Sequence, residues 1–207
     1  MKKLTIAALV TSSLFAANAS ATIMSVSSGT SSAGFSAQIT PAPGSVLNNN
    51  VTNQAQQGFN EQQLVSLTSD LSVDGGTIVK GTNVASHMIF LNKPNRVRGA
   101  ISHLDVEWMF DSKILGVMSD SGGTLEAASS SFLGAPGTTY PGAFGARGME
   151  GNDSYIIDGN KLTVSMRVTQ PGDWIRVITD VPEPASMALF GLGLMGLGLS
   201  RRRKNKA

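Results

Sequence analysis

The residues best suited by type and spacing to do chemistry lie in one short run, residues 101–111. His103, Asp105 and Glu107 occupy alternate positions within it. Because side chains two positions apart on a strand share a face, we expect these three on one face and the apolar residues on the other. The apolar residues expected opposite are Leu104, Val106, Trp108 and Phe110.

Two chemistries fit this run. His103, Asp105 and Glu107 could ligate a divalent ion, and Asp105 and Glu107, with Asp111 nearby, could act as acid and base on a glycan. A strand with one solvated face gives the same alternation without any site, and we favour that interpretation. We therefore assign no catalytic residue and no metal ligand, and keep these four side chains as candidates.

Other candidates are more dispersed. Aspartates at predicted turns could bind structural calcium, although turn formation alone explains them. These are Asp70, Asp74, Asp111, Asp120, Asp153 and Asp158. No other cofactor is expected. The aromatic residues that could stack on sugar rings are Trp108, Trp174, Tyr140 and Tyr155. A core position is preferred for Trp108, and Trp174 suits either role.

Composition excludes several classes of protein. The 207 residues include no cysteine, which rules out disulfides and thiolate metal sites. Residues 22–180 hold nine basic and 13 acidic residues, a net charge of −4, so the overall charge of +2 comes from the two ends. A mildly acidic body without a basic cluster does not predict nucleic-acid binding.

The first 21 residues have the three parts of a secretory signal peptide in order. Lys2 and Lys3 are followed by a mostly apolar, uncharged run and then by Ala19-Ser20-Ala21, a small-x-small cleavage site. We expect a signal helix that signal peptidase removes after Ala21.

The other end predicts a second processing signal, residues 181–207. Pro182 and Pro184 flank Glu183 and favour an extended, accessible segment. Residues 185–199 carry no charge, and as a helix they would span about 22 Å, which is short of a hydrocarbon core but able to lodge in a thinned bilayer. The basic residues that should stop transfer and remain cytoplasmic are Arg201, Arg202, Arg203 and Lys204.

Residues 181–204 resemble the PEP-CTERM sorting signal of Gram-negative bacteria, because the Pro-Glu-Pro core, the short Gly/Leu-rich segment and the arginine cluster occur in that order. The resemblance implies that an exosortase-like membrane protease-transpeptidase recognises Pro182, Glu183 and Pro184. It also implies transient residence in the inner membrane and delivery to the envelope, the cell surface or an exopolysaccharide-containing biofilm matrix.

The body divides by composition at residue 61. Residues 22–60 are rich in Ser, Asn and Gln and are expected to be partly flexible, with short strands near 33–39. Residues 61–180 alternate short β-prone runs with turn signals, which predicts an antiparallel, jelly-roll-like β-sandwich. Asp158-Gly159-Asn160 predicts a hairpin, residues 129–147 read as a long loop, and no helix is expected in the body.

These features together predict an exported matrix protein with a structural or interaction role. The alternatives are an extracellular carbohydrate-binding module and an enzyme that acts on polysaccharide. The non-catalytic role is preferred because no catalytic motif is evident in the sequence.

Overall fold

The computed structural model describes residues 20–48, 53–93 and 98–181. Within these residues the chain is mostly β, with one helix, α1 (Thr124–Leu133). The strands are β1 (Ile23–Val26), β2 (Thr30–Ser31), β3 (Gln38–Ile39), β4 (Gln57–Asn60), β5 (Val65–Ser66), β6 (Leu71–Val73), β7 (Gly76–Ile78), β8 (Asn83–Leu91), β9 (Ile101–Phe110), β10 (Ile114–Met118), β11 (Ser154–Asp158), β12 (Lys161–Val168) and β13 (Asp173–Asp180).

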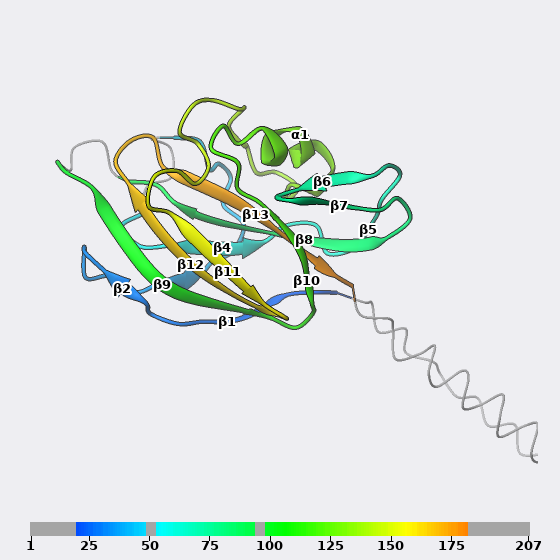
Figure 1. The fold of residues 1–207 in the computed structure, drawn as a ribbon, viewed down its shortest axis with the longest axis horizontal. Helices are drawn as coiled ribbons and strands as arrows, with labels where there is room; N and C mark the ends of the chain where they lie inside the picture. The colour runs from blue at the N-terminus through cyan, green and yellow to red at the C-terminus, as the bar shows by residue number, and fades with distance from the viewer. Residues whose placement is uncertain (1–19, 49–52, 94–97, 182–207) are drawn as a thin grey trace, which may run out of the picture. The chain divides into compact units, whose positions relative to one another are not determined.

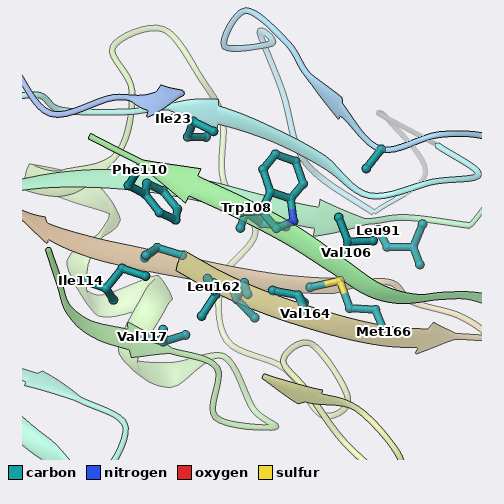
Figure 2. Packing of buried hydrophobic residues seen from close by; sticks show 14 of the residues in the cluster. Ile23, Leu91, Val106, Trp108, Phe110, Ile114, Val117, Leu162, Val164 and Met166 are labelled. Atoms are coloured by element: carbon teal, nitrogen blue, oxygen red, sulfur yellow. The ribbon is translucent and has the colours of Figure 1, made fainter. Parts of the chain in front are cut away.

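Two sheets face each other across a shared core (Figures 1 and 2). The first has the order β1-β9-β12-β11, with β2 also paired to β9. The second has the order β10-β13-β8-β4-β3, with β5 also paired to β8. Their pairings are antiparallel except for β3 with β4, and β6 and β7 form a separate hairpin.

The core between the sheets comes from alternate residues of facing strands. Val106 and Trp108 of β9 and Leu162 of β12 meet Ile175 and Val177 of β13 in one buried cluster. Figure 2 shows Trp108 within the cluster that also contains Val106 and Leu162. Burying such large apolar side chains contributes on the order of 1.5–3 kcal/mol each, and no disulfide is needed.

The second sheet is covered on its other face as well. Met118 and Ile178 belong to a cluster with Leu133 of α1 and with Ile78 of the β6–β7 hairpin. For this reason β8 and β13 are buried along nearly their whole lengths. A strand buried on both faces reads as a continuous apolar run, as Met88–Leu91 of β8 does, whereas Arg176 interrupts the apolar run of β13.

The polar segment before residue 61 belongs to the same compact unit as the strands that follow it. It supplies β1 to β4, and its Gln56 is fully buried between the sheets. The Gln56 amide nitrogen donates to the carbonyl oxygens of His103 (3.0 Å) and Val164 (3.1 Å), and its amide oxygen accepts from the Trp108 indole (3.0 Å). A glutamine therefore acts as a core residue because its hydrogen bonds are satisfied there.

The expectation of no helix in the body was wrong, because α1 begins at Thr124 and extends into residues 129–147, which were read as a loop. Asp120 accepts from the backbone N–H groups of Thr124 (2.8 Å) and Leu125 (3.0 Å), which stabilises the helix start. The buried face of α1 includes Glu126 and Ser129, so its sequence shows no apolar period.

Several expectations fall on undescribed residues. Residues 1–19 of the predicted signal peptide (1–21) and the whole of the predicted membrane segment (185–199) lie outside the described parts. Among the described residues, no helix is long and apolar enough to cross a membrane. The predicted hairpin is confirmed, with β11 and β12 joined through Gly159 at φ 63°.

Candidate functional site

A β-bulge breaks the predicted row of polar side chains on β9. Val106 pairs with Val164 and His103 with Met166, so two residues of β9 face only Ser165 of β12. Asp105 takes a positive φ of 55°, which is characteristic of a bulge position that twists the strand. The bulge shifts the alternation, so the expectation that Leu104 faces the core was wrong and Leu104 is exposed.

His103 lies on the core side of β9 and is separated from Asp105 and Glu107. Its Nδ1 accepts from the backbone N–H of Gln56 at 3.0 Å, and its Nε2 contacts the carbonyl oxygen of Ser28 at 2.5 Å. Burial lowers the pKa of His103, partly offset by the Ser28 contact, so the ring is neutral and donates through Nε2. Both ring nitrogens are engaged, and the three-ligand metal row on β9 is not formed.

The three candidate carboxylates are exposed, and each has its own hydrogen-bond or ion-pair partner. Asp105 accepts from the Ser165 hydroxyl at 3.3 Å, and Glu107 forms an ion pair with Lys161 at 3.0 Å. Asp111 accepts from the backbone N–H (2.8 Å) and the hydroxyl (3.1 Å) of Thr22, which holds the start of the described chain against the end of β9. These contacts account for the three carboxylates as surface groups.

His87 lies deep between the sheets. Its Nδ1 is 2.8 Å from Asn60 Oδ1 and its Nε2 is 3.0 Å from the Thr179 hydroxyl, while the ring contacts Phe110. Since the amide oxygen only accepts, Nδ1 carries the proton and Nε2 accepts from Thr179. Burial lowers the pKa of His87 to about 3, so this histidine is a neutral core residue.

The most heavily charged site in the described residues is a buried network of two arginines and two glutamates. Arg176 of β13 binds Glu61 through two nitrogens, at 2.7 and 2.8 Å. It also reaches Glu126 of α1 at 3.2 Å, and Glu126 pairs with Arg147. All four side chains are almost completely buried.

The network is closed by neutral partners. Arg176 donates to the Glu126 carbonyl oxygen and the Ser129 hydroxyl, both at 2.7 Å, and Arg147 donates to the Gly123 carbonyl oxygen at 2.7 Å. The charges balance and most of the hydrogen bonds are satisfied, with Arg147 Nε left without a partner among the described residues. Such an arrangement fixes the geometry of the side chains that it joins. We interpret the network as structural.

A cluster of three acidic residues lies where residues 147–153 cross the start of β13. Glu150, Asp153 and Asp173 each place a ligand oxygen within 4.8 Å of the others. Burial, with the charges of Asp153 and Glu150, raises the pKa of Asp173 to about 9. Burial and the charge of Asp153 also raise the pKa of Glu150. Oxygen donors of this kind suit a hard divalent cation.

The sequence predicted only part of this group. Asp153 was among the turn aspartates considered for calcium, whereas Glu150 and Asp173 were not singled out. Glu150 and Asp153 are three residues apart, but Asp173 reaches them only because residues 147–153 cross the start of β13, where the Trp174 N–H donates to the Arg147 carbonyl oxygen. No local spacing encodes that contact, so the sequence offered no signal for it.

A hollow of about 220 Å³ lies beside β3 and β4. Phe35, which is 53% exposed, provides an aromatic surface in it. The lining residues are Phe35, Ser36, Gln38, Asn53, Gln54, Ala55 and Gln57. Trp108 and Trp174, which the sequence offered for sugar stacking, are fully buried and unavailable for it.

The predicted processing residues lie mostly outside the described parts of the chain. Pro182, Glu183, Pro184, the cluster from Arg201 to Lys204, and Ala19 are all outside them. Ala21 is described and buried, and the signal-cleavage prediction stays a prediction. Just before the Pro-Glu-Pro sequence, β13 ends at Asp180, whose N–H donates to the Lys113 carbonyl oxygen at 2.8 Å.

Residues 180–204 match the family model of the PEP-CTERM protein-sorting motif. The chain therefore carries a PEP-CTERM sorting signal, as the sequence resemblance indicated. This motif implies recognition by an exosortase, a membrane protease-like enzyme, and export to the cell envelope or surface. No curated protein and no solved structure matches the chain.

The Glu61→Gln substitution should destabilise the protein strongly. It keeps the side-chain shape but removes one of two buried negative charges, leaving Arg176 and Arg147 to share Glu126. We expect a loss of about 3–5 kcal/mol of unfolding free energy, measured by urea titration. Glu107→Gln, which breaks the exposed pair with Lys161, is the control and should change little. A Glu61→Gln loss as small as that of the control would show that the buried network is not required.

His87 should make stability depend on pH. The unfolded imidazole takes up a proton near pH 6.5, whereas the folded one does so only near pH 3, so this contribution is present above pH 6.5 and is lost as the pH falls toward 3. Asp173 acts in the opposite direction over this range. The informative quantity is therefore the stability of the native chain minus that of His87→Gln.

That difference should fall by up to about 1.4 kcal/mol per pH unit between pH 6 and 4, as measured by urea unfolding at each pH. His103→Gln, assayed in parallel, should show a smaller dependence because burial of His103 is partly offset by its contact with Ser28. A native-minus-variant difference that does not change with pH would mean that His87 is accessible to protons in the folded state.

Proposed function

We propose that the protein is an exported component of an extracellular or biofilm matrix with a structural or interaction role. Its body would be a jelly-roll-like β-sandwich that a signal peptide directs outward and that an exosortase releases near Pro182–Pro184. The sorting motif at residues 180–204 is the observation that carries this proposal. The inner membrane and signal peptidase would be transient partners, in a Gram-negative cell.

A non-catalytic role is supported by how the candidate carboxylates are arranged. Asp105 and Glu107 are exposed and engaged with Ser165 and Lys161. None of the three catalytic candidates, Asp111 included, lines the hollow beside β3 and β4. A glycan hydrolase instead needs two carboxyl groups that converge on one substrate site.

Carbohydrate binding is the second candidate function, and the hollow lined by Phe35 favours it. An exposed aromatic ring can stack on a sugar face, while the amides of Gln38, Gln54 and Gln57 offer both donors and acceptors to hydroxyl groups. Exopolysaccharide is the ligand class that this surface and the sorting signal suggest together.

Intact mass spectrometry tests the sorting proposal. The native protein recovered from envelope and medium should end between residues 181 and 184, because the Pro-Glu-Pro segment is the recognition site. Glu183→Ala should retain its tail, and Glu107→Ala should be processed like the native chain. A native protein that ends at Ala207 in the membrane would contradict exosortase sorting.

The Phe35→Ala substitution tests glycan binding. Removing the stacking surface should weaken binding to the exopolysaccharide of the producing bacterium about tenfold, equivalent to about 1.4 kcal/mol, as measured by calorimetry. Phe132→Ala is the matched control, since Phe132 is 42% exposed and lines a different cavity. Equal affinity of Phe35→Ala and the native chain would exclude this hollow as the binding surface.

A further inference from the structure

Asp173 is a buried carboxyl group whose environment is incomplete in the described structure. The residue is 2% exposed, at the first position of β13. Its Oδ2 atom is buried and accepts no hydrogen bond from a donor among the described residues, and the side-chain partner of Asp173 is another acid, Asp153. Leaving a buried acceptor unsatisfied costs about 1–3 kcal/mol, so such an atom calls for an explanation.

The nearest ligand oxygens belong to two further acids. Glu150, Asp153 and Asp173 place theirs within 4.8 Å of one another. Two oxygens on opposite sides of a calcium ion are about 4.6–5.2 Å apart, because each Ca–O distance is about 2.3–2.6 Å. The spacing of the three oxygens therefore fits within a single coordination shell.

Among the residues that the structure describes, no basic side chain forms an ion pair with this group. The ion pairs formed by described residues involve Glu61, Glu107 and Glu126, and none includes Glu150, Asp153 or Asp173. Three carboxylates so close together repel one another unless a cation or a proton lies between them.

Hydrogen bonds hold the three acidic side chains in place and leave lone pairs free on the carboxylate oxygens of Asp153. Asp153 accepts from the backbone N–H groups of Arg167 (2.6 Å) and Glu150 (3.0 Å), one on each oxygen. Each carboxylate oxygen has two acceptor positions, so both can still bind an ion. The backbone N–H of Trp174 donates to the Arg147 carbonyl oxygen at 3.0 Å, which fixes β13 against the loop that carries the other two acids.

The three side chains also provide a graded path from solvent. Glu150 is exposed, Asp153 is half-buried and Asp173 is buried. A cation could enter at Glu150 and come to rest against Asp173, while water completes its coordination. Calcium sites in extracellular modules use such mixed oxygen shells.

We propose that Glu150, Asp153 and Asp173 form a binding site for a hard divalent cation of the calcium type. The ion would join residues 147–153 to the start of β13. This inference is independent of the proposed sorting and of glycan binding.

The raised pKa of Asp173, about 9, gives the site a second measurable property. Without the ion this carboxyl holds a proton at neutral pH, and a cation must displace it. Binding should therefore release a proton. The measured heat should change with the ionisation enthalpy of the buffer.

Calorimetric titration of the full chain with CaCl₂, in a mild detergent, tests the proposal. We expect one ion per chain with a dissociation constant of about 10⁻⁴–10⁻³ M, and a rise in unfolding temperature at about 10 mM calcium. Asp173→Asn should lower the affinity at least tenfold and abolish the rise. Asp158→Asn, an exposed aspartate in the β11–β12 turn, should behave like the native chain.

Two results would overturn the proposal. The first is the absence of both heat and thermal shift with calcium, magnesium and manganese at about 10 mM, which would mean that a shared proton alone stabilises the three carboxyls. The second is unchanged binding by Asp173→Asn, which would place the ion elsewhere. Circular dichroism of Asp173→Asn establishes that the variant is folded, so either result can be interpreted.

Discussion

The way in which the strands and the helix pack together depends on one buried network of ion pairs. Arg176 and Arg147 are enclosed with Glu61 and Glu126, and each pair comes from segments far apart in the chain. Since an unpaired buried charge is very costly, β13, α1, the end of β4 and residues 134–148 must assemble together. Arg176 lies between Trp174 and Ile178 on the outer side of β13, while Ile175 and Val177 face the other sheet. One strand thus serves the apolar core and the ionic network at once.

The strands were predictable because their signals are local. The alternating run at residues 101–111 and the turn at Asp158-Gly159-Asn160 located β9 and the β11–β12 hairpin within a few residues. The helix α1 was not predictable in this way, because its buried face carries Glu126 and Ser129, whose burial depends on Arg176 in a distant strand. The burial of Gln56 has the same origin, since its partners lie on β9 and β12. Polar residues that enter a core through long-range partners leave no periodic pattern.

The candidate sites also differ in whether their signal is local in the sequence or depends on long-range contacts. The sorting signal is a linear motif, so residues 180–204 were recognised from sequence alone. The proposed row of His103, Asp105 and Glu107 assumed an unbroken period of two, and the bulge at Asp105 removed it. The acidic group at Glu150, Asp153 and Asp173 arises only when the chain folds. Sequence therefore predicts the sorting motif well and surface chemistry poorly in this protein.

The position of β13 has a mechanical consequence. This strand is paired antiparallel with β10 on one side and with β8 on the other, and it ends at Asp180, just before the Pro-Glu-Pro sequence. If the cut end becomes attached to a matrix polymer, tension would enter the body along the axis of β13. Hydrogen bonds in antiparallel sheets are perpendicular to the strands, so those on both sides of β13 would be loaded together in shear. The body would then resist pulling best from the end at which it is attached.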